Sequence, residues 1–141
     1  MKKIYSKIQP DKLLHIVHRL TDVINRKTQR VDLINPDQFI QCSSLKMSKG
    51  TTFKAHKHIW KSGPTDVIAQ ESWVVIMGSV KCYFYDLDDS LLETVNLFVG
   101  DVSFTLSGGH NYEILEDSTI VYEYKTGPYE GQILDKEFLD D

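Results

Sequence analysis

The chain has 141 residues, with 16 lysines and arginines against 20 aspartates and glutamates, so its formal net charge at pH 7 is -4. This length suffices for one domain with a hydrophobic core, and no shift in composition marks a second. The lysines are scattered, and no run of about 18 apolar residues occurs. We therefore expect no nucleic-acid and no membrane partner.

The first 38 residues differ from the rest of the chain. Residues 13–24 place apolar side chains at helical spacing, but the same run also alternates well enough for a strand, so both interpretations stay open. Residues 25–38 are polar and predict a linker. We expect residues 1–38 to form an N-terminal extension that is well placed to pair with a second subunit in a homodimer.

From Phe39 onward, short runs rich in β-branched and aromatic residues alternate with turn residues. The runs are 39–48, 51–57, 72–77, 79–86, 91–98, 101–106, 110–115 and 119–125. Such runs without a helical pattern predict an all-β domain over residues 39–125, closed as a jelly-roll barrel. Residues 126–141 are expected to form a tail packed on the outside of the barrel.

Cysteine usage and the N-terminus indicate where the protein resides. Cys42 and Cys82 are far apart and lie in strand-like runs, which is typical of reduced thiols in the core or barrel wall rather than of a disulfide framework. The basic N-terminal segment is not followed by the apolar stretch of a signal peptide. The sequence therefore predicts a cytoplasmic protein.

A histidine pair is the first indication of chemistry. His56 and His58 are two positions apart on a predicted strand, so both imidazoles project from the same face. Two imidazoles with a carboxylate commonly bind Fe, Mn, Ni or Zn, and a third imidazole would complete the site. Such a pair alone is more often hydrogen-bonded on a surface or in a core, so the residues around it decide the interpretation.

Those residues resemble the first motif of the cupin superfamily, G(X)5HXH(X)nE(X)6G, which fits at Gly50, His56, His58, Glu71 and Gly78. The resemblance implies a cupin-type double-stranded β-helix. It also implies that one divalent metal ion (Fe, Zn, Mn or Ni) is bound by the two histidines and the glutamate of this motif.

The second cupin motif, G(X)5PXG(X)2H, fits less completely. Gly100 and Gly108 match, but Leu106 stands where proline is usual, and His110 comes one residue early. The resemblance implies that His110 is the fourth metal ligand.

The segment between His58 and Glu71 is also longer than the pattern usually allows. It has twelve residues and carries Trp60 and a Gly63-Pro64 turn, which we expect at the barrel mouth, where loops shape ligand access.

Strand alternation extends the ligand face to further side chains. It adds Trp73 from the strand of Glu71, Lys54 and Thr52 from the strand of His56, and Tyr112 from the strand of His110. Tyr112 and Lys54 are the acid/base candidates that this pattern places near the metal. Trp73, Thr52 and Trp60 are candidate substrate contacts, although Trp73 is equally well interpreted as core.

The distribution of arginine bears on the ligand. No arginine occurs after Arg30, and arginine is the side chain best suited to grip phosphate or carboxylate with two hydrogen bonds. A barrel without arginine predicts a small, weakly charged ligand rather than a nucleotide diphosphate.

A narrower similarity covers roughly the last hundred residues. The stretch from Gly50 to His58, followed by FYDLDD, VYEYKTGPYEG and DKEF, resembles small cupin-fold metalloproteins of the WbuC type, which are associated with cell-surface polysaccharide and O-antigen biosynthesis. It implies a sugar-like small molecule as the ligand. An isomerase, epimerase or lyase that uses the metal as a Lewis acid, an Fe(II)-dependent oxygenase and a non-catalytic binding protein all stay open. A metal-free barrel whose histidines only hydrogen-bond is a further alternative.

Overall fold

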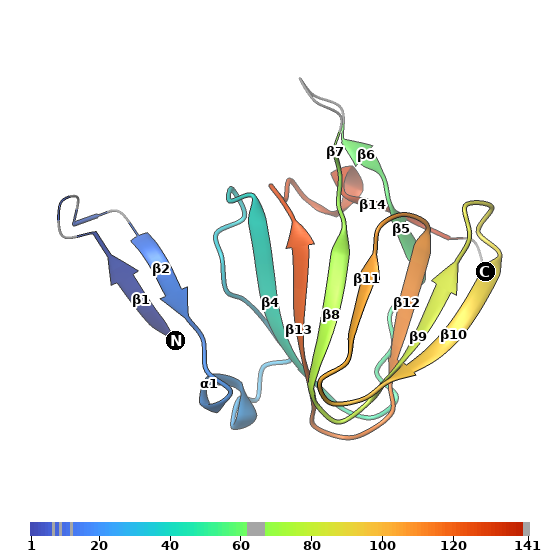
Figure 1. Ribbon diagram of the computed structural model, residues 1–141, viewed down its shortest axis with the longest axis horizontal. Helices are drawn as coiled ribbons and strands as arrows, with labels where there is room; N and C mark the ends of the chain where they lie inside the picture. Colours follow the sequence, from blue (N-terminus) through green and yellow to red (C-terminus); the bar gives the residue numbers. More distant parts are fainter. Residues whose placement is uncertain (7, 9, 12, 62–66, 140–141) are drawn as a thin grey trace.

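The computed structural model describes residues 1–6, 8, 10–11, 13–61 and 67–139. Its main body consists of two five-stranded antiparallel sheets that face each other (Figure 1). One sheet has the order β10-β9-β12-β5-β14, and the other has the order β11-β8-β13-β4-β3. This arrangement confirms the predicted all-β, double-stranded β-helix.

The strand bounds agree closely with the predicted runs. The first sheet contains β5 (His56–His58), β9 (Val80–Tyr85), β10 (Leu91–Leu97), β12 (Gly109–Ile114) and β14 (Lys136–Phe138). The second contains β3 (Arg30–Asp32), β4 (Ile40–Met47), β8 (Glu71–Met77), β11 (Val102–Thr105) and β13 (Thr119–Thr126). The run 51–57 differs most, because its regular strand begins only at His56 and Thr52 forms an isolated bridge with Glu113.

The N-terminal residues contain both elements that the pattern left open. The strands β1 (Lys2–Tyr5) and β2 (Leu13–Val17) pair as a hairpin that projects beside the barrel, and the short helix α1 (Thr21–Ile24) follows (Figure 1). The expected linker 25–38 differs from the prediction, since it contains β3, which pairs with β4. A strand of three residues with two charged side chains gives little apolar alternation to detect.

Three short elements lie around the open end of the barrel. The strands β6 (Trp60–Lys61) and β7 (Val67–Ile68) pair with each other, and the 3-10 helix η1 (Gln132–Leu134) precedes β14. The predicted Gly63-Pro64 turn lies outside the described residues. No helix in the described ranges has both the length and the apolar character needed to cross a bilayer.

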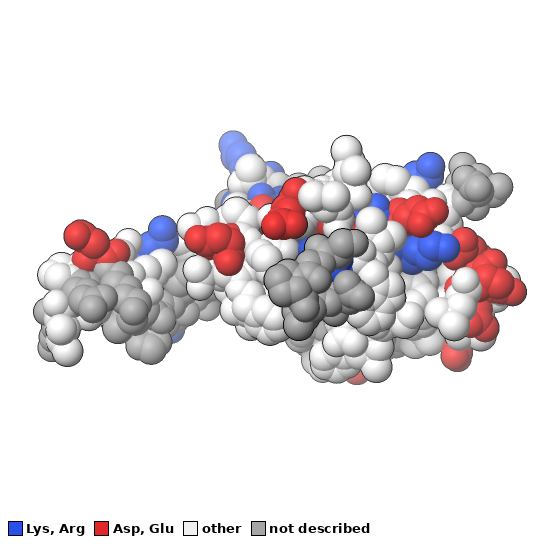
Figure 2. Space-filling model, turned by 90° about the horizontal axis from the view of Figure 1, so that it is seen from above, with Lys and Arg blue, Asp and Glu red and all other residues white. Residues whose placement is uncertain are grey.

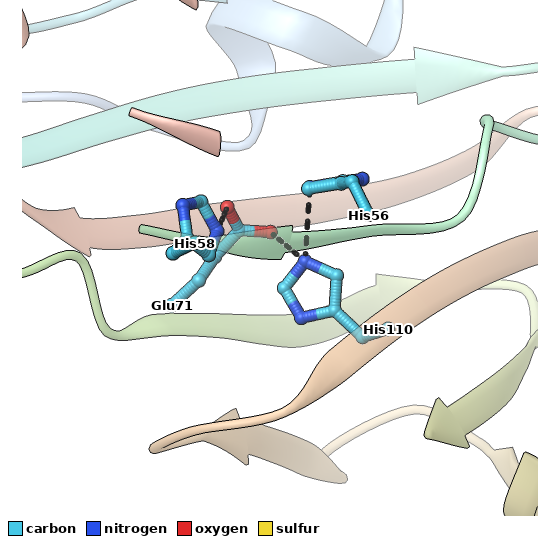
Figure 3. A group of neighbouring side chains, drawn as sticks. All are labelled: His56, His58, Glu71 and His110. Carbon is cyan, nitrogen blue, oxygen red and sulfur yellow. Dashed lines mark hydrogen bonds and ion pairs between the residues drawn. The ribbon is translucent and has the colours of Figure 1, made fainter. Parts of the chain in front are cut away.

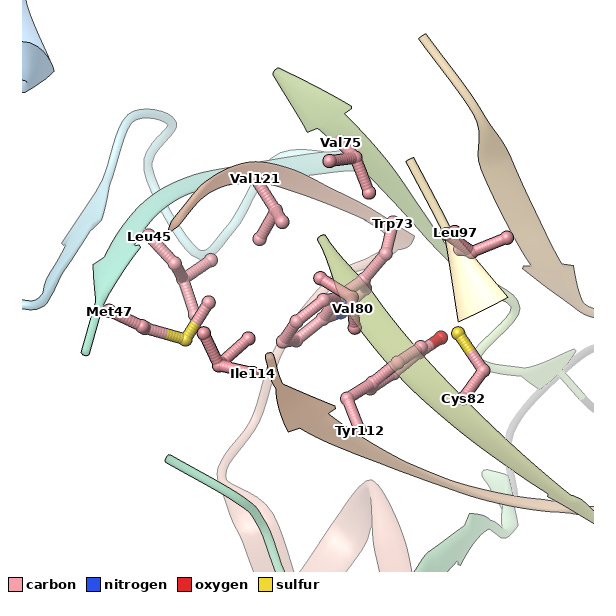
Figure 4. Close-up of a cluster of buried hydrophobic side chains, with 10 residues drawn as sticks. All are labelled: Leu45, Met47, Trp73, Val75, Val80, Cys82, Leu97, Tyr112, Ile114 and Val121. Atoms are coloured by element: carbon pink, nitrogen blue, oxygen red, sulfur yellow. The ribbon is translucent and has the colours of Figure 1, made fainter. Parts of the chain in front are cut away.

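A hydrophobic core fills the other end of the barrel, where side chains from both sheets interdigitate (Figure 4). Its buried members are Leu45, Met47, Trp73, Val75, Val80, Cys82, Leu97, Tyr112, Ile114 and Val121. Every second side chain of β8 and β12 faces inward. On both strands this row of side chains begins in the core and reaches Glu71 and His110 at the open end. The packed end therefore supports a polar group of side chains at the open end.

Glycines with positive φ make the tight connections that hold these strands in place. Gly78 has φ +76°, and a Cβ atom there would lie 2.2 Å from the hydroxyl oxygen of Thr119. Gly108, just before β12, has φ +80°, and its Cβ would lie 2.5 Å from the carbonyl oxygen of Tyr85. Only glycine fits both the conformation and the close approach at these two positions.

Candidate metal centre

Four side chains from three strands converge at the open end of the barrel (Figure 3). His56 and His58 come from β5, His110 from β12 and Glu71 from β8, and one ligand atom of each lies within 4.8 Å of the others. His56 and His110 face each other in register on neighbouring strands. All four are buried, with at most 7% of their surface exposed. The structure thus brings together the four residues that the motifs single out.

Each of the three imidazoles is held from behind at its Nδ1 atom. The contacts are His56 to the carbonyl oxygen of Lys54 (3.0 Å), His58 to the carbonyl oxygen of Asp135 (3.2 Å) and His110 to the hydroxyl of Thr105 (2.7 Å). An imidazole that donates from Nδ1 keeps a free lone pair on Nε2. These contacts therefore fix the tautomer and the direction that a metal ligand needs.

The Nε2 atoms point into a shared space. Those of His56 and His110 are 3.2 Å apart, and that of His58 lies 3.4 Å from Oε2 of Glu71. The His58 Nε2 atom is buried, and the Glu71 carboxylate is the polar group that faces it. The other oxygen of this carboxylate, Oε1, lies 3.5 Å from Nε2 of His110. Three imidazoles and a carboxylate fit a divalent metal ion.

Glu71 is fixed as an ionised carboxylate. The indole N–H of Trp73 donates to its Oε1 at 3.1 Å. Burial alone would raise the pKa of Glu71, but the hydrogen bond with His58 and the neighbouring His110 hold that pKa well below its usual range. The carboxylate is therefore available as an anionic ligand at neutral pH.

The histidines differ in protonation. Burial, reinforced by the charge of Lys136, lowers the pKa of His56 to about 3, and burial lowers that of His110 to about 4. For His58 burial acts in the same direction, but Asp135 and Glu71 outweigh it and raise the pKa to about 9. At neutral pH the imidazoles of His56 and His110 are thus neutral. His58 holds a positive charge between two carboxylates and must release the proton of Nε2 before that atom can bind a metal.

The C-terminal tail supplies residues to this centre that sequence reasoning missed. It does not simply pack on the outside of the barrel as expected, because β14 pairs with β5. This pairing brings the fully buried Asp135 against His58 and Lys136 against His56. In the sequence, the apolar pair Phe138-Leu139 indicated that the segment docks. The charged residues before this pair belong to the DKEF stretch of the WbuC-type resemblance, but no role at the centre was predicted for them.

Tyr112 and Trp73 lie deeper than the alternation pattern predicted. Both are 2% exposed, and their rings stack in the hydrophobic core with centroids 4.0 Å apart. Burial raises the pKa of Tyr112 well above its usual range, so its phenol stays protonated. The structure therefore places both residues beneath the centre, where Trp73 orients Glu71, rather than along a ligand cavity.

The other three predicted contacts are on the surface. Lys54 and Thr52 are exposed, since the regular strand does not extend back to them, and Lys54 Nζ lies over the ring of Phe138. Trp60 is 65% exposed on β6. Their roles as acid/base or substrate residues remain predictions, and the structure does not bring their side chains to the four ligands.

A cavity of about 380 Å³ lies inside the barrel next to the centre. Its polar lining includes Arg30, Gln41, Ser43, Glu123, Lys125 and Lys136. The expectation of an arginine-free cavity was wrong, because the unrecognised strand β3 carries Arg30 into the barrel. The guanidinium pairs with both carboxylate oxygens of Glu123, at 2.8 and 3.2 Å. The cavity is thus much more charged than the sequence suggested.

No protein-family model and no curated protein matches the chain significantly. Solved structures do match. KdgF from Halomonas sp. is 17% identical, with a TM-score of 0.54 over 72% of this chain and 80% of that one. Oxalate decarboxylase from Bacillus subtilis is 15% identical, with a TM-score of 0.56 over 73% of this chain, which spans only 24% of the enzyme.

A third match is an uncharacterised protein from Klebsiella pneumoniae with a double-stranded β-helix domain. It is 10% identical, with a TM-score of 0.61 over 91% of this chain and all of that one. These neighbours are cupin-fold proteins, and at such low identity they establish the fold alone. The chain therefore has the cupin fold that the motifs predicted.

Proposed function

We propose that this protein holds one divalent metal ion with His56, His58, Glu71 and His110, and uses it to bind or transform a small sugar-like molecule. The observation that carries the proposal is the convergence of three Nε2 atoms and one carboxylate, with every imidazole fixed at Nδ1. Interior histidines that only hydrogen-bond have no need to direct three Nε2 atoms toward one carboxylate, two of them 3.2 Å apart.

The ion would supply Lewis acidity, polarising a carbonyl or hydroxyl oxygen of the ligand. The chain itself contributes orientation and charge. Glu71 is held by Trp73, His58 is held by Asp135, and the walls of the barrel exclude bulk water from the four ligands. Glu123 is a second carboxyl group in the adjacent cavity; burial raises its pKa, but its pairing with Arg30 keeps it a carboxylate that can accept a hydrogen bond from a ligand.

Isomerisation, epimerisation or elimination of a sugar-like substrate is the reaction class that this arrangement favours. The cavity of about 380 Å³ is of the size that a small organic ligand occupies. The proposed setting is cell-surface polysaccharide biosynthesis in the cytoplasm. The resemblance to WbuC-type proteins supports the role in polysaccharide biosynthesis. The two free, buried cysteines support the cytoplasmic location.

Two other functions use the same ligands. With Fe(II), three imidazoles and a carboxylate suit an oxygenase. Without turnover, the protein would be a binding module whose ligand completes the metal coordination. The polar and charged lining of the cavity favours the sugar-directed proposal over a purely structural barrel.

Metal analysis of untagged protein is the first test. We expect about one equivalent of a divalent ion, and its loss in His56→Ala and Glu71→Gln variants. A content near zero that stays zero after reconstitution would end the proposal. A metal-free Glu71→Gln variant whose ligand affinity and turnover are both unchanged would also contradict the proposal, because the metal would then take no part in the function.

A further inference from the structure

One lysine at the candidate metal centre, Lys136, is influenced by the charges of Glu71, Glu123 and Asp135 but is in ion-pair contact with none of them. Lys136 is the first residue of β14, and its Nζ lies 3.0 Å from Nε2 of His56. Within the described part of the chain this imidazole is its hydrogen-bond partner, and no acidic group forms an ion pair with it. Its side chain also lines the cavity of about 380 Å³. Lys136 therefore lies between the four ligands and the space for a small molecule.

The other cations of the cavity already have acidic partners. Arg30 is paired with Glu123 and with Asp32. Lys125 is paired with Asp135 at 3.2 Å, and its Nζ lies 4.1 Å from the ring centroid of Tyr129. Lys136 is thus the cation of this lining that remains for a ligand.

Binding of a metal by His56 would remove the hydrogen-bond acceptor of Lys136. The Nε2 atom of His56 is both the predicted metal-binding atom and the acceptor that Lys136 uses. A lone pair given to a metal cannot also accept a hydrogen bond from an ammonium group. A half-buried ammonium without a partner is destabilising, whereas a carboxylate oxygen beside it forms a strong, charge-assisted hydrogen bond.

We propose that the ligand of this site is a small carboxylic acid of the hydroxy-acid or sugar-acid class, with its carboxylate held by Lys136 beside the metal. The inference rests on the proposed function and narrows its ligand. The remainder of the molecule occupies the cavity, whose lining includes the polar side chains of Gln41, Ser43 and Tyr129. Lys136 takes this role rather than Arg30, because Arg30 is already paired with Glu123.

The test compares ligands that differ only in charge. D-glucuronate and D-glucuronamide, together with glycolate and glycolamide, are titrated calorimetrically into the metal-loaded protein. We expect each carboxylate to bind at least roughly tenfold more tightly than its amide. With Co(II) as the metal, the visible absorption bands should change on adding the carboxylates and not the amides.

Variants connect this preference to one side chain. Lys136→Met should abolish the preference for carboxylates while metal content stays at the wild-type level, and Lys136→Arg should retain most of it. Lys81→Met is the matched control, since Lys81 lies on β9 over the ring of Tyr83 and outside the cavity lining; it should behave as wild type.

Three outcomes would overturn the inference in protein that retains its metal: amides that bind as tightly as carboxylates, a full preference in Lys136→Met, or no binding of either carboxylate. Failure of the proposed function is distinguishable, because it appears as protein that holds no metal. Binding of glucuronate that depends on Lys136 in such metal-free protein would support the carboxylate inference alone.

Discussion

The Nδ1 atom of His58 lies 3.2 Å from a carboxylate oxygen of Asp135, a residue 77 positions farther along the chain. A carboxylate behind an imidazole fixes the ring and makes its other nitrogen a stronger metal ligand. Asp135 is fully buried and is itself balanced by Lys61 at 3.0 Å and Lys125 at 3.2 Å. The candidate centre thus includes a second layer of charged groups behind its ligands.

Replacing Asp135 by asparagine should weaken metal binding by about 10- to 100-fold, because His58 loses its anionic partner. Competition with a chromophoric chelator measures the affinity. Asp37→Asn, at an exposed aspartate, should leave it unchanged. Equal affinities of the Asp135 variant and wild type would contradict a role for this carboxylate in positioning His58.

The metal-free protein should be most stable near pH 6.5. His56 and His110 have pKa values lowered to about 3 and about 4, so below pH 6.5 the unfolded chain binds more protons and stability falls. His58 has a pKa raised to about 9, so the stabilisation by its proton is lost as the pH rises from 6.5 to 9.

Urea unfolding of chelator-treated protein across this range tests the prediction. His58→Gln should remove the decline on the alkaline side and leave the acidic decline in place. Unfolding free energies that keep rising toward pH 9 would be incompatible with a protonated His58 between two carboxylates.

The two thiols should be unreactive in the folded protein. Burial raises the pKa of Cys42 to about 11 and that of Cys82 to about 12. At pH 8 only about one molecule in a thousand then carries a thiolate at Cys42, and still fewer at Cys82. Ellman's reagent should label neither residue until urea is added and then label both. Rapid labelling without denaturant would show that the barrel wall is open at these positions.

The pair of Arg30 and Glu123 should contribute to stability. Removing the guanidinium leaves a buried carboxylate unpaired, and because 42% of the Arg30 side chain is exposed, we expect Arg30→Met to cost about 2 kcal/mol rather than the value for a fully buried pair. The double variant Arg30→Met/Glu123→Met should recover much of the loss in urea unfolding.

Lys57→Met breaks a surface pair with Asp89 and serves as the control, with little expected change. If the single Arg30 variant were as stable as this control, the charge pair would have no structural importance.

We also expect a homodimer. The outer face of the sheet containing β8 and β13 exposes Phe39, Ile40, Phe104 and Leu106, each more than half accessible, around an apolar hollow of about 330 Å³. Apolar patches of this kind often mark interfaces. Light scattering should give twice the 16.2 kDa of one chain, and Phe104→Ser should reduce it to the monomer.

Phe98→Ser is the matched control for the dimer, because Phe98 is similarly exposed but lies in the connection between β10 and β11. A monomeric wild-type protein at micromolar concentration would contradict the expectation. Seen from above, the molecule carries acidic and basic side chains on the same surface (Figure 2).

The predictable part of the fold is the part in which local pattern and tertiary packing agree. From β8 to β13 the strands bury one face in a shared core, so apolar alternation shows in the sequence and the bounds match within a residue or two. The strands β3 and β14 have three residues each and are largely charged, because they line a polar cavity, so they left no such pattern.

The candidate site was predictable to the same extent. His56, His58 and Glu71 are recognisable by their spacing, and the structure shows that His110 joins them despite its shortened motif. Alternation placed Tyr112 beside the ligands, and its ring centroid does lie 5.3 Å from that of His110, but the ring stacks on Trp73 and belongs to the core. Asp135 and Lys136 depend on long-range pairing of β14 with β5, which spacing along the chain cannot reveal.

That pairing also determines when the centre can exist during synthesis. A ribosome that has just made His58 has another 77 residues to add before Asp135, roughly 4–15 s at ordinary rates of about 5–20 residues per second. Until then β5 lacks the neighbour that holds His58 and brings Lys136 to His56. The complete centre, with Asp135 behind His58 and Lys136 beside His56, therefore forms only after β14 has been translated.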